Sequence, residues 1–307
     1  MPYSIAVNGR LPRRCCNDPV DRAIVQPSIF VSHGSPMIAL DPGRAGPFLR
    51  QLGRAIDECF GRPRAILAIS AHTLARDRLL LGAPRHEAVY DFGGFPDELY
   101  RLRYDAPGDP ALAEQARALL ADAGLRTAVL PDGGLDHGIW TALRYIYPDA
   151  DVPVVPLAMD PHAAPAQQFA LGERLAPLCA DGVLVMGTGG ITHNLQRVAM
   201  TRRFHARIDE AEAMPEIAQS AAFRGWMHER SRDRDWPALF DYRDRAPAAR
   251  DMHPTDEHLL PFFVAAGAGG RDVPPVRLHE SVTFGCLGMD AYAFGALAQA
   301  LHGHASA

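Results

Sequence analysis

The chain has 307 residues, which is long enough for one large α/β domain or two small ones. Hydrophobic residues make up 48% of it and charged residues 22%, as in an ordinary globular protein. The net charge of −5 argues against a nucleic-acid partner, because such proteins usually carry a basic face. No apolar stretch approaches the length of a membrane span, so no membrane partner is expected either.

The N-terminal residues 1–26 lack an apolar signal core and carry scattered arginines. We expect them to form a poorly ordered extension, with a targeting role as the alternative, and residues 27–307 to form one catalytic domain. The five cysteines show no paired CxxC spacing, and five is an odd number. A disulfide scaffold or a zinc ribbon is therefore not expected, and a reducing, cytoplasmic location is.

The first half of the chain is predicted to alternate between strands and helices. Apolar runs without polar interruption indicate strands buried on both faces, and apolar residues three or four apart indicate helices. These patterns predict strands over 28–32, 65–70, 78–82 and 127–130, and helices over 45–60, 110–124 and 139–147.

The second half follows the same patterns with weaker boundaries. It predicts strands over 152–159, 182–186 and 276–283, helices over 165–180, 256–266 and 291–301, and one or two helices within 207–230. Thr255 is the expected N-cap of the helix over 256–266. Residues 236–250 are charged, contain proline, and are expected to be irregular.

The alternation of strands and helices predicts one three-layer α/β/α domain around a largely buried sheet. The long connection between residues 195 and 255 leaves room for an antiparallel strand pair, so we expect a mixed sheet.

Three histidines follow predicted strands, namely His33, His72 and His193. In open α/β sheets, sites form outside the carboxyl ends of the strands. Imidazole is the commonest protein ligand for transition metals and the usual proton carrier near neutral pH. Three rings delivered to one sheet edge therefore predict a metal site with acid–base partners.

Other candidates have plainer interpretations. His137 follows Asp136, and this pair could simply start a helix; Glu257 and His258 could belong to the solvated first turn of another. Phe92 and Phe95 flank two glycines, and they either line a pocket in a movable loop or only pack that loop.

An ordered series of short motifs resembles the class III extradiol ring-cleavage dioxygenases, in particular their 4,5-DOPA extradiol dioxygenase branch. The resemblance covers residues 27–300 and rests on SHGSP at 32–36, SAHT at 70–73, DFGGFP at 91–96, DHGIW at 136–140, THNL at 192–195 and HPTDEHLLPF at 253–262. It implies metal ligands at His33, His72 and His258. His253 and Glu257 compete with His258 for the third position.

The resemblance further implies that His193 transfers protons and that His137 lines the substrate side and assists in acid–base steps. The expected substrate contacts are Ser35, Thr73, Phe92 and Phe95; Thr73 stands where close relatives often carry Trp.

The implied activity is a metal-dependent opening of a catechol-type, DOPA-like ring with O2, which gives a muconate semialdehyde-type product. Fe(II) suits this chemistry, and three neutral imidazoles also suit Zn(II). A zinc-dependent hydrolase, a 2-aminophenol-cleaving dioxygenase and a non-catalytic metal- or ligand-binding module remain as alternatives. The expected partners are the small aromatic substrate and O2, and the oligomeric state stays open.

Overall fold

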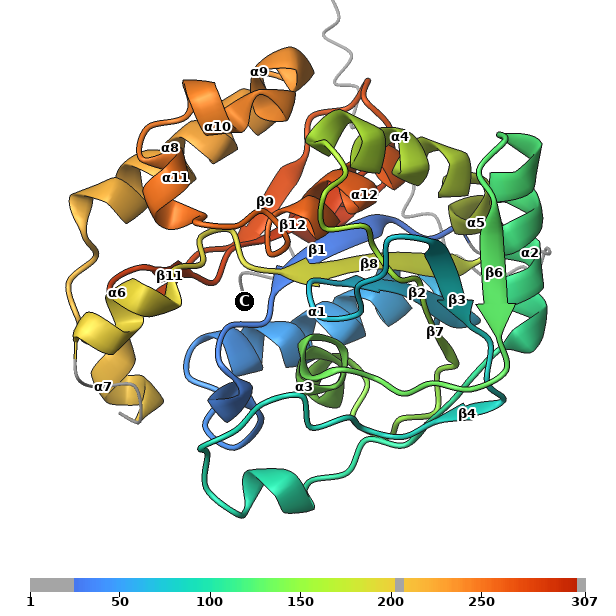
Figure 1. Ribbon diagram of the computed structural model, residues 1–307, viewed down its shortest axis with the longest axis horizontal. Helices are drawn as coiled ribbons and strands as arrows, with labels where there is room; N and C mark the ends of the chain where they lie inside the picture. The colour runs from blue at the N-terminus through green and yellow to red at the C-terminus, as the bar shows by residue number, and fades with distance from the viewer. Residues whose placement is uncertain (1–24, 202–206, 303–307) are drawn as a thin grey trace, which may run out of the picture.

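A mixed six-stranded sheet organises the protein, whose computed structural model describes residues 25–201 and 207–302 (Figure 1). The strands lie in the order β7 (Val154–Pro156), β2 (Ala65–Ser70), β8 (Val183–Gly189), β1 (Ser28–Ser32), β12 (Ala291–Phe294) and β9 (Val276–His279). The pairs from β7 to β1 are parallel, whereas β12 pairs antiparallel with both β1 and β9. The antiparallel strands thus come from the C-terminal end of the chain.

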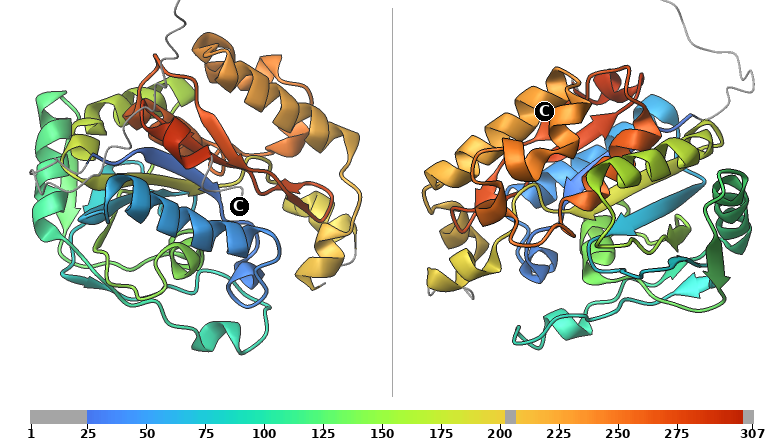
Figure 2. Two further views of the ribbon diagram at one scale, coloured as in Figure 1. Left: turned by 180° about the vertical axis from the view of Figure 1, so that it is seen from behind. Right: turned by 45° about the horizontal axis from the view of Figure 1, so that its top comes forward.

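Alternate residues of each strand feed two separate cores. In β2, Leu67 and Ile69 face one core, whereas Ile66 and Ala68 face the other, as the two-residue period of a strand requires. One core is closed by α2 (Pro110–Asp122), α4 (Pro165–Leu175) and α12 (Leu260–Gly269), and the other by α1 (Ala45–Phe60), α3 (His137–Ile146) and α13 (Ala298–His302). The view from behind in Figure 2 shows α1 lying across its face of the sheet. The predicted three-layer α/β/α architecture with a mixed, buried sheet is confirmed.

Shorter elements surround this core. Three two-stranded pairs form from β3 (Arg78–Leu81) with β6 (Thr127–Leu130), β4 (Arg85–His86) with β5 (Ala106–Pro107), and β10 (Val282–Thr283) with β11 (Leu287–Gly288). The short helices are η1 (Pro36–Ala39), η2 (Leu99–Arg101), α5 (Pro177–Ala180), α6 (Leu195–Met200) and α7 (Ile208–Glu212), and α8 (Ala218–Arg232) is a longer one.

The predicted closing helix over 291–301 is wrong in its first half. Residues Ala291–Phe294 form β12, which fills the place between β1 and β9 and contributes side chains to both cores. Gly295, with φ at +95°, ends the strand before α13 begins. The predicted strand over 276–283 divides in the same region into β9 and β10, which belong to different sheets.

The helix expected over 256–266 begins at Leu260, so Thr255 is not its N-cap. The Thr255 hydroxyl instead donates to Glu257 Oε1 at 2.9 Å. The segment expected to be irregular forms α9 (Trp236–Phe240), α10 (Tyr242–Arg245) and α11 (Ala249–Met252). The helix expected over 165–180 breaks before Pro177, because proline has no N–H to continue the ladder.

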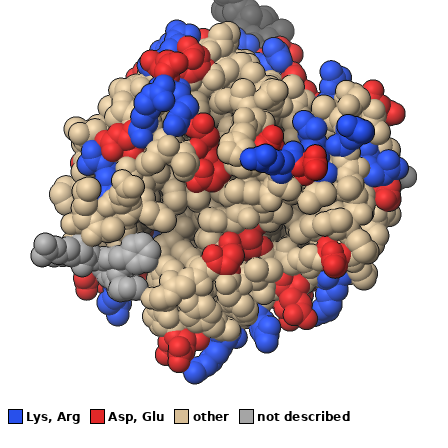
Figure 3. All heavy atoms as spheres, viewed as in Figure 1, with Lys and Arg blue, Asp and Glu red and all other residues tan. Residues whose placement is uncertain are grey.

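The proposed N-terminal extension falls mostly on residues 1–24, which lie outside the described residues. Gln26 is buried in the domain, where its backbone N–H donates to Cys179 O and its side-chain amide to Gly61 O. Among the described residues, no helix combines the length and apolar character needed to cross a bilayer. On the face in Figure 3, basic and acidic side chains are interspersed among uncharged ones.

Candidate metal centre and its cavity

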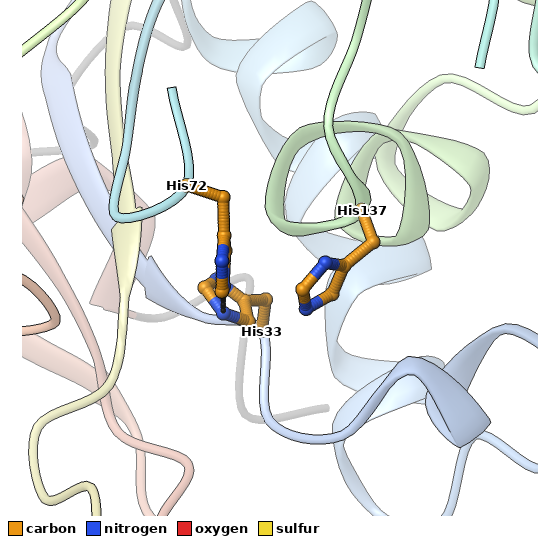
Figure 4. A group of neighbouring side chains, drawn as sticks. All are labelled: His33, His72 and His137. Atoms are coloured by element: carbon orange, nitrogen blue, oxygen red, sulfur yellow. Dashed lines mark hydrogen bonds between the residues drawn. The ribbon is translucent and has the colours of Figure 1, made fainter. Parts of the chain in front are cut away.

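His33 and His72 meet at the carboxyl edge of the sheet. His33 directly follows β1, and His72 follows β2 after one residue, so the two histidines flank the end of β8. Their Nε2 atoms lie 3.1 Å apart, and His137, at the start of α3, turns its ring toward both (Figure 4). The two histidines that were predicted from their positions after strands therefore bring their rings together, and the rings do not lie apart on the surface.

The tautomer of His33 is set by Thr188 in β8. The Thr188 hydroxyl donates to the Gly138 carbonyl at 2.8 Å, so its oxygen is free to accept the Nδ1–H of His33 at 3.0 Å. The Nε2 lone pair of His33 is thus left on the side of His72. This is the state in which an imidazole binds a metal, with its other ring nitrogen held by a hydrogen bond.

His258 reaches the same place from the turn before α12. A Cβ on Gly189 would lie 2.1 Å from the His258 carbonyl, and Gly190 N–H donates to that carbonyl at 2.9 Å. Gly189, at the end of β8, can approach the turn this closely only because glycine has no side chain. The ring centroid of His258 consequently lies 5.5 Å from that of His33 and 4.9 Å from that of His72.

One nitrogen of His258 is left for a ligand. Its Nδ1–H donates to Glu257 Oε1 at 3.0 Å, whereas its Nε2 is buried and has no hydrogen-bond partner in the described part of the chain. A buried nitrogen with a free lone pair is costly unless something binds it. The residues present therefore fit a metal ion.

His193 completes the cluster from the loop after β8. Its backbone N–H donates to Met252 O at 2.9 Å, and its ring stacks on His258 with centroids 3.4 Å apart and planes inclined by 5°. Burial, and then the nearby His253, lowers the pKa of His193 to about 3. The His193 ring is therefore neutral beside the candidate ligand.

His137 is held by two acidic side chains. Asp136 caps α3 by accepting from Ile139 N–H at 3.3 Å, which fixes the first turn. Asp91 Oδ1 then accepts both the backbone N–H of His137 at 3.0 Å and its Nδ1–H at 2.9 Å. Burial would raise the pKa of Asp91, but the hydrogen bonds from His137, together with the charges of His137 and His72, outweigh it and lower that pKa.

The three candidate ligand rings His33, His72 and His258 are kept neutral by their surroundings. Burial, together with His137, lowers the pKa of His72 to about 4, and burial with the neighbouring imidazoles lowers the pKa of His33 and His258 well below the usual value. Metal ligands must be deprotonated, so three rings that are neutral at neutral pH are prepared for a cation.

Proximity alone divides the possible ligand atoms into two groups. One comprises His33, His72 and His137, and the other comprises His193, Glu257 and His258; within each group the atoms lie within 4.8 Å of one another. The ligand set implied by the resemblance takes two members from the first group and one from the second. Whether His137 or His258 is the third metal ligand is therefore tested by substituting each residue.

The two alternatives to His258 lie in supporting positions. His253 Nε2–H donates to Ile191 O at 3.0 Å, and its ring packs against Phe223 and Tyr242 rather than in the histidine cluster. Glu257 accepts the hydrogen bond from His258 Nδ1.

All the rings of this cluster open into one cavity of about 290 Å³. Of the four residues predicted to contact the substrate, Ser35, Phe92 and Phe95 line this cavity. Thr73 is not among the lining residues and donates its hydroxyl to Asp136 Oδ2 at 2.5 Å. The remaining lining residues are the histidines and Gly34, Pro36, Asp91, Gly93, Leu195, Val198, Phe284 and Leu287.

The sequence analysis missed Asp91 and the apolar wall of the cavity. Asp91 directly precedes Phe92 in a segment noted only for its aromatic residues, so a signal for it was present. Phe284 and Leu287 lie far along the chain and carried no signal, because their place in the wall depends on long-range packing.

Comparison with known proteins gives a consistent result over most of the chain. The model of a family described as the catalytic LigB subunit of aromatic ring-opening dioxygenase matches residues 27–295. A Beta vulgaris protein named 4,5-DOPA dioxygenase extradiol is 32% identical over 277 residues, which cover 88% of this chain and 97% of the relative. An Escherichia coli K12 protein of the same name is 32% identical over 267 residues, covering 86% of this chain and 92% of the relative.

A solved structure shares the fold. It is the crystal structure of a protein from Escherichia coli K12 described as uncharacterized, with a TM-score of 0.68 and 26% sequence identity. The match covers 88% of this chain and 100% of that one.

Proposed function

Because the chain belongs to the family of the catalytic LigB subunit of aromatic ring-opening dioxygenase, and is an extradiol ring-cleaving dioxygenase, we propose that it opens a catechol-type aromatic with O2 to a muconate semialdehyde-type product. The observation that carries the proposal is the placement of His258 Nε2. This buried nitrogen has no hydrogen-bond partner among the described residues, and its ring centroid lies 5.5 Å from that of His33 and 4.9 Å from that of His72 in the lining of a cavity of about 290 Å³.

His33, His72 and His258 hold the metal ion in this proposal. When bound, Fe(II) would supply open coordination positions for both the catecholate and O2. Three neutral imidazoles leave the charge of the ion uncompensated, which favours an anionic catecholate, but they would also accept Zn(II). An Fe(II) enzyme also fits the reducing, cytoplasmic compartment predicted from the cysteines.

His193 and His137 move protons around the substrate. The His193 ring lines the cavity, where it accepts a proton from a catechol hydroxyl as a general base. His137 has its Nδ1–H bound to Asp91, so its Nε2 is the nitrogen that exchanges a proton with the cavity.

The remaining predicted contacts divide into two kinds. Phe92 and Phe95 pack against the aromatic ring of the substrate, and Ser35 borders it beside His33. Thr73 acts at a distance, because its hydroxyl holds Asp136, the residue that caps α3 beneath His137.

Anaerobic reconstitution with Fe(II), followed by exposure to air with a panel of catechols and 2-aminophenol, tests the proposal. Consumption of O2 with formation of a yellow ring-opened product is expected for a catechol, and the Zn(II)-loaded protein serves as the inactive control. Faster turnover of 2-aminophenol would assign the substrate to that class. Ester hydrolysis by the Zn(II) form without O2 would replace the proposal with a zinc hydrolase.

A further inference from the structure

His193 and His258 come from two chain segments that hydrogen bonds join to each other. One segment is 189–194, at the end of β8 and in the loop after it, and the other is 251–258, from the end of α11 to the turn before α12. The two imidazole rings stack with centroids 3.4 Å apart, and no hydrogen bond joins one ring to the other among the described contacts. Their separation therefore depends on how the two segments are held together.

Four hydrogen bonds cross between these segments. They run from Gly190 N–H to His258 O at 2.9 Å, from His253 Nε2–H to Ile191 O at 3.0 Å, from His193 N–H to Met252 O at 2.9 Å, and from Asn194 Nδ2–H to Asp251 O at 2.6 Å. Two of the donors are backbone groups, which no substitution of a side chain removes. Of the two side-chain donors in these four bonds, His253 is the one that belongs to the segment carrying His258.

His253 is a fully buried histidine that uses one ring nitrogen. A carbonyl oxygen can only accept, so Nε2 carries the proton in the bond to Ile191 O. Nδ1 is then an acceptor, and it is buried without a hydrogen-bond partner among the described residues. Such an unsatisfied nitrogen is costly. An apolar side chain would avoid this cost, but it would also remove the donor that reaches the Ile191 carbonyl.

The turn that follows His253 is held from its outer side by α10. Arg243 Nη1 donates to the His253 carbonyl at 2.9 Å and to Asp256 Oδ1 at 2.5 Å, and the Tyr242 hydroxyl donates to the same carboxylate oxygen. The His253 ring itself packs against Tyr242. The start of the turn is therefore fixed by His253 on the side of the β8 loop and by Arg243 on the opposite side.

Resting on the function proposed above, we infer that His253 is a positioning residue that keeps the His258 ring and the His193 ring in register, with Arg243 supporting it. His253 is not among the residues that line the cavity, so it acts through the backbone of the two segments. A displacement of about 1 Å can cost about 100-fold in rate. The bond from His253 should therefore affect metal binding through His258 and catalysis through His193.

Amide substitutions of His253 test which ring nitrogen matters. The side-chain nitrogen of Gln is as many bonds from Cβ as Nε2 of His, and that of Asn is as many as Nδ1. His253→Gln can therefore keep the bond to Ile191 O, whereas His253→Asn cannot. Competition with a chromophoric chelator measures the Zn(II) affinity of the folded full chain. We expect a nearly native affinity in His253→Gln and a loss of about tenfold or more in His253→Asn.

Two further variants separate positioning from folding. The side chain of Arg243 is 27% exposed, so Arg243→Gln should fold and should weaken Zn(II) binding several-fold even if His253→Asn does not fold. His86 is another buried histidine, which donates from Nδ1 to Gly133 O at 3.3 Å and does not line the cavity. His86→Gln is therefore the matched control, with a lowered melting temperature and an unchanged Zn(II) affinity.

Two results would overturn the inference. Native Zn(II) affinity in Arg243→Gln and in folded His253→Asn, with only the melting temperature lowered, would leave His253 a role in folding alone. An equal loss of affinity in His253→Gln and His253→Asn would show that the bond from Nε2 does not set the position of His258.

Oxygen uptake by the Fe(II) form separates this inference from the proposed function. In His253→Asn, kcat should fall about tenfold or more with KM for the catechol less changed, and His253→Gln should restore it. If the native chain consumed no O2 with any catechol, the dioxygenase proposal would be refuted, and the order of Zn(II) affinities would still decide the role of His253. Native kcat and native Zn(II) affinity in His253→Asn would refute the positioning role and leave the dioxygenase standing. A native chain that binds no Zn(II) would refute both.

Discussion

Single hydrogen bonds decide which nitrogen each active-site imidazole presents to the cavity. Thr188, Asp91 and Glu257 each bind the Nδ1 atom of a different ring, namely His33, His137 and His258. In each of these rings Nε2 is thereby the nitrogen that remains on the side of the cavity. Because five histidine rings lie close enough to contribute to a three-histidine set, the role of each ring has to be assigned from its effect on metal binding and catalysis and not from proximity alone.

Substitution of one ring at a time identifies the third ligand. We expect His258→Ala to lose the bound metal, since Nε2 of His258 is a buried nitrogen of the cluster that has no hydrogen-bond partner among the described residues. His137→Ala should keep the metal, because this ring is tied to Asp91. The exposed His162 provides the control substitution. Metal content after dialysis measures the result, and loss from His137→Ala with retention by His258→Ala would reverse the assignment.

Substitution of His193 should separate metal binding from catalysis. We expect His193→Ala to retain the metal and to lose about two to four orders of magnitude in kcat, the range for a positioned proton carrier. The ring stacks on His258 without a hydrogen bond to it among the described contacts, so its removal leaves the Nδ1–H bond of His258 to Glu257 in place. Metal analysis and steady-state kinetics on the same preparation check this, and simultaneous loss of metal would contradict it.

Asp91 is a positioning residue for His137. In Asp91→Asn, the amide keeps one acceptor but loses the charge that attracts the His137 Nδ1–H, so the ring loses its fixed tautomer. We expect kcat to fall about 10–100-fold, the usual effect of losing such a partner, with KM less affected. Asp97→Asn, on the same loop with 87% of its side chain exposed, is the control.

If Asp91 acted only in folding, activity and thermal stability would decline together. An unchanged melting temperature with reduced kcat supports the positioning role, and rescue by Asp91→Glu would support it further. Equal activity of Asp91→Asn and the native enzyme would exclude it.

At the scale of elements, the local sequence pattern was sufficient to predict an element where its apolar residues are regularly spaced. β1, β2 and α1 match their predicted boundaries because apolar runs and helical spacing are explicit in the sequence. β12 was mistaken for a helix because its alanines carry no strand preference, and only its pairing with β1 and β9 makes it a strand.

The same division applies to the site. His33, His72 and His193 were predictable because strand ends gather at one edge of a sheet, whereas the role of His258 was inferred from resemblance to a family. Asp91 and Leu287 depend on loop packing, for which a single sequence has no periodic signal.

The crossing of α4 and α12 offers a test of element packing. A Cβ on Gly172 would lie 2.0 Å from the Val264 carbonyl, so Gly172→Ala should destabilise the fold by about 1–3 kcal/mol through overpacking. Gly225 in α8 has nothing within 4 Å of its Cβ position, so Gly225→Ala should stabilise by up to about 1 kcal/mol. Urea unfolding measures both, and equal effects of the two substitutions would refute the close crossing.

For the whole molecule, the candidate metal centre joins parts that the sheet alone leaves separate. His33 and His72 extend the central strands, His258 precedes α12 on one face, and His137 begins α3 on the other. An ion held by His33, His72 and His258 would therefore connect the ends of the central strands to the turn before α12, and local binding would stabilise the global fold.

Metal binding should therefore raise the melting temperature. A ligand that binds only the folded state at one hundred times its dissociation constant adds about 2.7 kcal/mol to the free energy of unfolding. We expect Zn(II) to raise the melting temperature of the metal-free protein by several degrees, and EDTA to reverse the increase. Mg²⁺ should have little effect, because it prefers oxygen ligands to imidazole.

His258→Ala should lose most of the Zn(II)-dependent increase, since Nε2 of His258 lies among the converging nitrogens. Scanning calorimetry measures the melting temperatures. An undiminished increase in that variant would place the stabilising ion outside the histidine cluster.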